Sequence, residues 1–351
     1  MKFILFCQYP YAFGIMQPIM QVLKDKQHEY LWFLTENLRG KFPFPDEPHT
    51  FEIEEIENYR SDVIFCPGNE VPHYLRGLKT QIFHGLAGEK KGHFKIRHYF
   101  DLYLTQGPYF TRRFQRLKRR HKNFDVIETG WPKLDIYGNE RDKYGEEKKE
   151  LLKQHSAKKI LLYAPTFSPS LTSGPFLLKD LKKVADNEDY LLLIKFHDLM
   201  SPELIKQYRQ FAAERSNVIF EEEPNIVKFL LMADLLISDT SSVVYEFLLL
   251  DKPVITFRSN SQIKLWENIT EASTLSDKIQ QNLGKDPYAE QRQTIIAEYH
   301  PYNDGQSALR MVNVVEDYVE EHGVPERRKL PFVRRRKMNR MFRRKKKQSR
   351  S

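Results

Sequence analysis

The sequence is poor in cysteine, with two in 351 residues, and it contains no long apolar run. Cys7 and Cys66 both lie in apolar segments of strand character, so we expect reduced, buried thiols and no disulfide. No segment approaches the roughly 20 apolar residues that cross a bilayer, which excludes an ordinary membrane-spanning helix. The apolar start over residues 2–7 is too short for a signal peptide, and we expect a cytoplasmic protein.

Three common signatures of nucleotide or metal binding are also absent. The chain contains no G-x-G-x-x-G dinucleotide fingerprint and no Walker-type phosphate loop. It also has no Cys/His spacing of the kind that holds zinc and no carboxylate pair at metal-binding spacing. The sequence therefore gives no sign of a dinucleotide, P-loop or zinc enzyme.

Basic charge is concentrated at the C-terminal end. Residues 326–351 hold 14 Lys and Arg against one acidic residue, a net charge of +13, whereas the whole chain carries +9. Residues 1–325 are therefore mildly acidic, and because a nucleic-acid-binding core carries its basic stripe on folded elements, we expect no nucleic-acid partner. We expect residues 326–351 to be a disordered tail that associates with an anionic membrane surface; the alternative is a disordered tail with incidental RNA affinity.

Apolar strands alternate with helical segments along the chain, which predicts parallel sheets with crossover helices. A charged helical segment over 140–156 separates two halves, so we place one domain at 1–150 and a second at 151–325. Strand-like runs lie at 2–7, 30–34, 63–66, 81–83, 101–105, 124–128, 159–167, 190–197, 217–220, 235–239 and 252–257. Helical patterns lie at 15–26, 109–120, 140–156, 176–186, 202–214, 225–232 and 305–321.

The stretch 235–247 combines a buried strand, a cluster of hydroxyl residues and a helix. The cluster is Thr240, Ser241 and Ser242, and a helix start with free N–H groups beside hydroxyls suits a phosphate group. Glu246 follows one turn later, where a carboxylate could accept hydrogen bonds from ribose hydroxyls. The alternative is that a serine here only caps the helix.

Two histidines follow predicted strands. His84 and Gly85 open a loop that contains Lys90 and further glycines, and ligands of parallel sheets bind beyond the carboxyl ends of strands. A histidine there can accept a proton near neutral pH; the alternative is an ordinary surface histidine. His197 ends another strand with Lys195 two residues earlier on the same face, and its alternative is a core histidine bonded to a carbonyl.

Taken in order, these motifs resemble the CDP-glycerol glycerophosphotransferase family, the polymerases and primases of teichoic acid and related capsule assembly. The resemblance spans roughly residues 80–320 and implies the GT-B fold, with two Rossmann-like domains facing across a cleft. The matching segments are His84-Gly85 with Lys90, Thr129-Gly130-Trp131-Pro132-Lys133-Leu134-Asp135, Tyr163-Ala164-Pro165-Thr166-Phe167, Lys195-Phe196-His197, Ser238-Asp239-Thr240-Ser241-Ser242 and Tyr302-Asn303-Asp304-Gly305-Gln306-Ser307-Ala308.

The resemblance implies transfer of an alditol phosphate from a CDP-activated donor to a hydroxyl of a lipid-linked or glycan acceptor, with release of CMP and without a metal. The N-terminal domain then serves the acceptor and the C-terminal domain binds the donor, on the inner face of a bacterial cell membrane. The expected catalytic residues are His84 as general base and His197 at the pyrophosphate. The expected substrate-binding residues are Gly85, Lys90, Thr166, Lys195, Thr240, Ser241, Ser242, Glu246, Asp304 and Gly305; for Asp304 a helix cap explains the residue equally well.

Two rival functions stay open on the sequence alone. A GT-B nucleotide-sugar glycosyltransferase or epimerase of surface polysaccharide synthesis shares the two-domain architecture and a Glu on the ribose. A catalytically idle scaffold that docks on membrane or RNA through its basic tail is the other. The nucleotide released from labelled CDP-alditols and UDP-sugars distinguishes all three.

Overall fold

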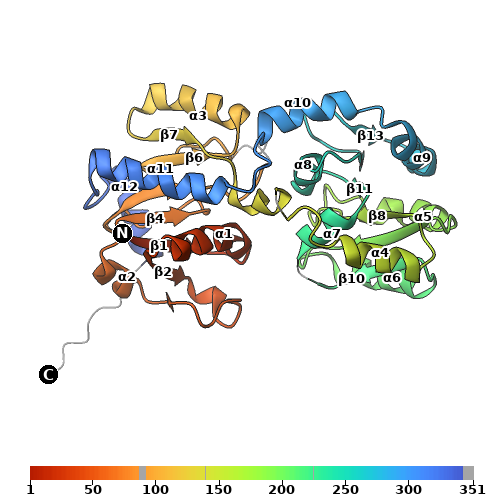
Figure 1. Cartoon of the computed structure of the whole chain (residues 1–351), viewed down its shortest axis with the longest axis horizontal. Helices are drawn as coiled ribbons and strands as arrows, with labels where there is room; N and C mark the ends of the chain where they lie inside the picture. Colours follow the sequence, from red (N-terminus) through yellow and green to blue (C-terminus); the bar gives the residue numbers. More distant parts are fainter. Residues whose placement is uncertain (87–91, 139, 224, 343–351) are drawn as a thin grey trace. The chain divides into compact units, whose positions relative to one another are not determined.

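The computed structural model describes residues 1–86, 92–138, 140–223 and 225–342. The chain forms two compact units, each with its own sheet (Figure 1). The first unit comprises residues 1–85, 94–139 and 299 onward, and the second comprises 86–93 and 140–298.

The first unit is built on a seven-stranded sheet with the order β3-β2-β1-β4-β5-β6-β7. All of its strand pairs are parallel, and the strands are apolar along most of their length because both faces are covered. The strands are β1 Lys2–Cys7, β2 Glu29–Leu34, β3 His49–Thr50, β4 Val63–Cys66, β5 Leu78–Gln81, β6 Leu102–Thr105 and β7 Asp125–Glu128. The helices are α1 Tyr11–Asp25, α2 Ile53–Tyr59, α3 Pro108–His121, α11 Ser307–His322 and α12 Phe332–Met341, with the 3₁₀ turns η1 Glu36–Leu38 and η2 Pro132–Tyr137.

The second unit repeats this plan with six parallel strands in the order β10-β9-β8-β11-β12-β13. Numbered within the unit this is 3-2-1-4-5-6, the doubly wound order of Rossmann-like folds. The strands are β8 Lys159–Tyr163, β9 Tyr190–Lys195, β10 Val218–Glu221, β11 Leu235–Ser238, β12 Val254–Phe257 and β13 Glu267–Ile269. The helices are α4 Gly145–Gln154, α5 Gly174–Val184, α6 Pro202–Ala213, α7 Ile226–Met232, α8 Val243–Leu248, α9 Leu275–Lys285 and α10 Ala289–Tyr299, with the 3₁₀ turn η3 Ala272–Thr274. Two Rossmann-like parallel sheets confirm the predicted α/β class.

The predicted domains 1–150 and 151–325 are wrong at the start and at the end of the second domain. Besides residues 86–93, the second unit comprises 140–298 instead of 151–325, and α11 belongs to the first unit, where it packs beside α1 (Figure 1). Glu316 of α11 forms ion pairs with Lys26 and His28 just after α1. The chain therefore returns to its first unit after completing the second, and sequence order alone did not reveal this return.

The prediction of a disordered tail over 326–351 is wrong for its described part. Residues 332–341 form α12, in which Met338 is completely buried, and Phe342 after it is 8% exposed. Phe342 packs edge-on against Phe6 of β1, with 5.6 Å between ring centroids. No helix connects β4 to β5 or β5 to β6 among the described residues, and α12 joins the core cluster of this sheet in their place. Residues 343–351 lie outside the described part.

Within the described ranges, no helix combines the length and apolar character needed to cross a membrane.

Candidate active site

In the second unit, the predicted donor-binding residues follow strands that lie next to each other. Strand order reverses between β8 and β11, and in open parallel sheets ligands bind beyond the carboxyl ends of the strands at such a point. Thr166 lies three residues after β8, and Thr240, Ser241 and Ser242 follow β11. The register pairs Tyr163 with Ile237, so these two loops leave the sheet side by side.

A buried carboxylate of the matching segment 238–242, for which no role was predicted, holds these two loops together. Asp239, 1% exposed, accepts hydrogen bonds from the backbone N–H of Thr166 and of Ser173 and from the Ser173 hydroxyl, all at 2.8 Å. The Ser238 hydroxyl donates to the Ala164 carbonyl at 2.6 Å. Burial raises the pKa of Asp239 to about 6, while the three hydrogen bonds oppose this shift. Asp239 therefore positions Thr166 relative to the hydroxyl cluster.

The three clustered hydroxyls retain the capacity to donate hydrogen bonds. The Thr240 hydroxyl oxygen accepts from the backbone N–H of Asn260 at 2.9 Å, and Ser241 Oγ accepts from Val243 N–H at 3.4 Å. Ser242 is the N-cap of α8 but makes no capping hydrogen bond with its side chain. Because a hydroxyl that accepts one bond still has its own proton to donate, the cluster suits an anion.

Glu246 lies on α8 one turn beyond the hydroxyl cluster, as predicted. It is only 5% exposed, whereas Ser241 and Ser242 are half-buried. A ribose would have to approach a largely covered carboxylate, so the role of Glu246 stays a prediction.

Lys195 and His197 occupy the carboxyl end of β9, which pairs with β8. Lys195 is 7% exposed and its ammonium donates to the Phe196 carbonyl at 3.0 Å. His197 is exposed, and its Nδ1 accepts from the backbone N–H of Leu199 at 3.1 Å. That bond assigns the ring proton to Nε2, which can donate to a ligand. Partial burial lowers the pKa of His197; Asp198 opposes the shift and Lys195 adds to it.

In the first unit, His84 lies beyond β5 with its ring fixed in orientation. Its Nδ1 is 3.0 Å from the Pro67 carbonyl oxygen, and its ring is 5.2 Å from that of Tyr11. Because a carbonyl oxygen only accepts, Nδ1 must carry the proton, and the lone pair is then on Nε2. Pro67 follows β4 and Tyr11 opens α1 after β1, so His84 lies where strand order reverses in this sheet.

Two glutamines that sequence reasoning missed support the backbone around His84. The Gln106 amide donates to the Gly85 carbonyl at 3.1 Å, and the Gln81 amide donates to the Gly68 carbonyl at 2.7 Å. Gln106 is completely buried directly after β6, and Gln81 is the last residue of β5. A polar residue at the end of an apolar strand was the signal available. Lys90, predicted to bind substrate, lies outside the described residues.

Asp304 and Gly305 are not grouped with the other predicted substrate-binding residues of the second unit. Both belong to the first unit, just before α11. Asp304 accepts from Gln306 N–H at 3.1 Å and forms a 2.6 Å ion pair with Arg310, which holds the pKa of Asp304 below its usual value. Asp304 therefore stabilises the turn before α11, but it does not bond the N–H groups of the helix itself. Placing Asp304 and Gly305 in the donor-binding domain was wrong.

The segment 129–135 makes contacts that hold the start of α11 in place. The Asp135 carboxylate accepts from the backbone N–H groups of Ser307 and Ala308, both at 2.8 Å, and so caps α11. Gly130 has a φ of +88°, and a Cβ there would lie 2.4 Å from the Ser307 hydroxyl oxygen. Only glycine fits this close approach. The motif therefore fixes the returning helix to the first unit.

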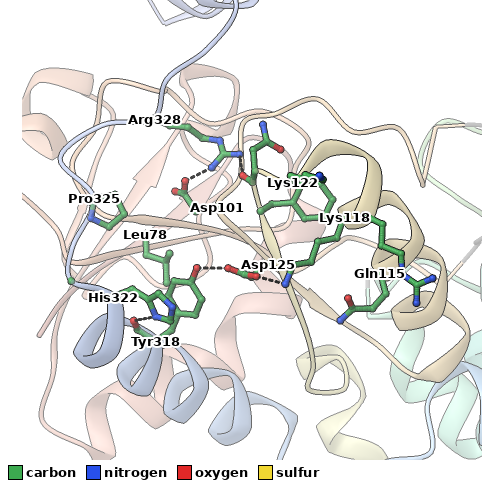
Figure 2. Close-up of a pocket in the computed structure, with 14 residues that line it drawn as sticks. Leu78, Asp101, Gln115, Lys118, Lys122, Asp125, Tyr318, His322, Pro325 and Arg328 are labelled. Carbon is green, nitrogen blue, oxygen red and sulfur yellow. Dashed lines mark hydrogen bonds and ion pairs between the residues drawn. The ribbon is translucent and has the colours of Figure 1, made fainter.

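The cavity in Figure 2 lies at the opposite edge of the first sheet from His84. It has a volume of about 770 Å³ and is lined where strands begin, by Leu78 of β5, Asp101 before β6 and Asp125 of β7. The described residues contain no group of three or more His, Cys, Asp or Glu side chains placed to hold a metal ion. The candidate site is therefore the set of strand-end residues, and not this cavity.

The two doubly wound sheets define a protein of Rossmann-like architecture, the type found in GT-B proteins. A solved structure of the wall teichoic acid polymerase TagF matches with a TM-score of 0.66 at 18% identity, over 91% of this chain and 89% of that chain. This likeness concerns the fold. The chain belongs to the CDP-Glycerol:Poly(glycerophosphate) glycerophosphotransferase family, whose model matches residues 79–263. The predicted family membership is confirmed.

Two curated relatives show how far the sequence similarity extends. A teichoic acid poly(glycerol phosphate) polymerase of Bacillus spizizenii is 29% identical over 178 residues, 48% of this chain and 43% of the relative. The teichoic acid ribitol-phosphate polymerase TarL of Staphylococcus aureus is 28% identical over 236 residues, 62% of this chain and 39% of the relative. The chain thus spans less than half the length of either relative.

Proposed function

We propose that this chain transfers glycerol phosphate, or a related alditol phosphate, from a CDP-activated donor to an acceptor hydroxyl and releases CMP. The observation that carries the proposal is the hydroxyl cluster 240–242, tied by Asp239 to the loop after β8 at the switch point of the second sheet. The family match over 79–263 includes this cluster and both histidines. Relatives are named for glycerol phosphate and for ribitol phosphate, so the family supports an alditol phosphate as the transferred group.

His84 acts as the general base in this proposal. Its Nδ1–H is held by the Pro67 carbonyl, so Nε2 accepts the proton of the acceptor hydroxyl as the oxygen attacks phosphorus. The new bond joins the acceptor oxygen to the phosphorus that bears the alditol. The bond from that phosphorus to the oxygen of CMP breaks, and CMP departs with the bonding electron pair.

The residues of the second unit bind the donor phosphates and stabilise the departing CMP. Thr166, Thr240, Ser241 and Ser242 offer hydroxyl donors, and His197 donates from Nε2. Such donors are most effective when they are already oriented, because they then stabilise developing charge without reorganising. Asp239 provides that orientation, while Lys195 adds positive charge beside His197.

The acceptor is a hydroxyl of a lipid-linked or glycan molecule, and the protein acts at the inner face of the cell membrane as a peripheral enzyme. Support comes from the basic C-terminal segment, since cations near an anionic leaflet contribute up to about 1 kcal/mol each. Curated relatives act in teichoic acid synthesis by their names.

The direct test is incubation of the full chain with labelled CDP-glycerol, CDP-ribitol and UDP-sugars, each with and without acceptor. Release of CMP from a CDP-alditol is expected, with the alditol phosphate recovered on the acceptor. Release of UDP from a UDP-sugar, with no CMP from either CDP-alditol, would instead support a nucleotide-sugar enzyme. Activity should survive EDTA, since we propose that no metal takes part.

Two histidine variants test whether His84 is the general base or whether any loss of an exposed histidine lowers activity. His84→Ala should reduce turnover by about a hundredfold to ten-thousandfold, the range that a general base contributes, while the donor still binds. His49→Ala is the matched control, because His49 is also exposed and also places Nδ1 on a carbonyl, that of Glu47 at 2.8 Å. Wild-type turnover in His84→Ala would remove His84 from the mechanism.

A further inference from the structure

A second cavity of the first unit lies beneath the C-terminal segment. Its volume is about 700 Å³. The connection from β4 to β5 contributes His73 and Tyr74, and the segment from Arg327 to Phe342 forms the remainder. Two backbone-anchored contacts hold these parts together: Arg328 N–H donates to the His73 carbonyl at 2.8 Å, and the Tyr74 hydroxyl donates to the Phe342 carbonyl at 3.0 Å.

The lining of this cavity is positively charged. None of the described residues that line it is acidic, whereas four are Arg or Lys. The guanidinium of Arg328 is occupied by Asp101. The side chains of Arg327, Lys329 and Arg335 have no ion pair or hydrogen bond with any described residue.

The acidic residue nearest in sequence does not neutralise these cations. Glu326 is held by Arg60 at 3.0 Å and by Arg76 at 3.2 Å. On α12 the neighbouring Lys337 is paired with Glu70 at 2.9 Å. Three of the four cations of the lining, all exposed, therefore have no acidic partner within the described part of the chain.

His73 gives an independent indication of a missing partner. It is 7% exposed, and its Nδ1 has no hydrogen-bond partner among the described residues. Burial lowers the pKa of His73, and the charges of Arg335, Lys79 and Arg327 lower it further. Buried polar atoms in native proteins are nearly always bonded, so this nitrogen has room for a partner. In the tautomer that carries the proton on Nδ1, it donates to an anion.

The cavity of Figure 2 differs in this respect, although it also contains several cations. Lys118 is paired with Asp125 at 2.5 Å, and the same carboxylate accepts from the Tyr318 hydroxyl at 2.6 Å (Figure 2). Arg328 is paired with Asp101 in the same view. Two of the cations in its lining are thus paired with acids that also line it, whereas the lining of the cavity beneath α12 contains no described acidic residue.

We propose that the cavity beneath α12 binds a phosphate group, free or carried by a lipid headgroup, through Arg327, Lys329, Arg335 and the His73 imidazole. Phosphate matches the site because its oxygens accept from several guanidinium and ammonium donors at once. The proposal does not depend on the transferase activity, since none of these residues belongs to the candidate active site; its lipid-headgroup form rests on the membrane association proposed above.

The test measures binding of labelled inorganic phosphate to the full chain by equilibrium dialysis at low ionic strength. Wild type should bind saturably, and Arg335→Ala and Arg327→Ala should each weaken binding about tenfold or more, as expected for a charge-assisted hydrogen bond. Arg336→Ala is the matched control, because Arg336 is exposed on the same helix, adjoins Arg335 and does not line the cavity. His73→Phe should also weaken binding, and the arginine variants keep the test valid should that core change impair folding.

Vesicles distinguish the two sources of phosphate. With vesicles of phosphatidylcholine containing phosphatidylglycerol, a headgroup ligand predicts that Arg335→Ala pellets less than Arg336→Ala and that inorganic phosphate competes with wild type. A free-phosphate ligand predicts equal pelleting of the two variants, with the difference confined to dialysis. Non-saturable phosphate binding, or equal loss in Arg335→Ala and Arg336→Ala in both assays, overturns the proposal.

Discussion

At the scale of single residues, Asp239 organises the donor-binding loops although it need not touch a substrate. Its carboxylate collects three hydrogen bonds from residues some 70 positions earlier, at 2.8 Å each. The sequence places it between a buried strand and a run of hydroxyls, where it reads as one more polar loop residue. Only the folded contacts show that it is a positioning residue.

Replacing Asp239 by Asn should loosen both loops. The amide keeps one acceptor oxygen but turns N–H donors toward the backbone N–H of Thr166 or Ser173, which leaves a buried donor unpaired at a cost of about 1–3 kcal/mol. Urea unfolding measures that loss, and the proposed reaction should show KM for the donor raised more than kcat is lowered. Glu188→Gln, an exposed acid of the same unit, is the control; equal behaviour of both variants would contradict the role of Asp239.

His300 should make the first unit less stable in mild acid. Its buried Nε2 accepts from the backbone N–H of Trp131 at 2.9 Å, and burial, with Arg310, lowers its pKa from 6.5 to about 4. The unfolded chain therefore takes up the proton first, so stability is full above about pH 6.5 and falls as pH decreases toward 4. Between pH 7.5 and 5 the loss from this residue should be about 2 kcal/mol.

Urea titrations at those two pH values check this expectation. In His300→Gln the amide oxygen still accepts from Trp131 but does not titrate, so the difference between the two pH values should shrink by about 2 kcal/mol. His49→Gln, at an exposed position, should leave the difference unchanged. An undiminished pH dependence in His300→Gln would show that other groups are responsible.

The position of most candidate site residues could be predicted from the sequence. The residues that hold the backbone around them could not. The hydroxyl cluster and both histidines follow apolar strands, so their position at the carboxyl ends of a parallel sheet could be inferred. Gln81, Gln106 and Asp239 act through bonds to distant backbone groups, which leave no pattern in the local sequence. Asp304 was assigned to the wrong unit, because the segment that contains it was taken to follow the second sheet.

At the scale of elements, α12 shows how a strongly basic segment still forms part of a core. The connections from β4 to β5 and from β5 to β6 leave one face of the first sheet without crossover helices among the described residues. Met338 on α12 and Phe342, the residue directly after the helix, both join the core cluster and fill that gap. The spacing of these two apolar residues was visible in the sequence. The many basic residues around them nevertheless led to the prediction of a disordered tail.

Replacing Met338 by Ala should destabilise the first unit by about 2–5 kcal/mol, as for other buried methionines. Met341→Ala on the same helix is the control, since Met341 is 45% exposed and its loss should cost under about 0.5 kcal/mol. Urea unfolding of both variants decides the matter. Equal stability of the two would mean that α12 does not pack on the sheet.

The main strands and most helices could be predicted, because buried parallel strands give apolar runs of characteristic length. The helices α2 and α9 were missed, although α9 buries Leu275 and Ile279 on one face. Three other missed elements carry a weaker signal. β3 has two residues and β13 three, and α10 has buried and polar positions without a clear apolar stripe. The return of α11 to the first unit depends on the caps from Asp135 and the pairs with Glu316, which are long-range contacts.

At the scale of the whole molecule, the basic C-terminal segment consists of two parts, and only one of them can be deleted without removing part of the core. Residues 326–342 carry eight of the 14 cations together with the core residues Met338 and Phe342, so deleting them would remove fold and charge at once. Residues 343–351 carry the other six cations. A chain that ends at Phe342 therefore isolates the electrostatic contribution.

That shortened chain should unfold in urea like the full chain but pellet far less with anionic vesicles. Six cations near an anionic surface contribute up to about 1 kcal/mol each, so even a fraction of that sum predicts at least a tenfold drop in partitioning. Raising the salt concentration should weaken vesicle binding by the full chain more than by the shortened chain, because salt screens the six cations that only the full chain carries. Unfolding at the same urea concentration establishes that the fold is intact. Equal pelleting of the two chains would then show that the last nine residues do not draw this protein to a membrane.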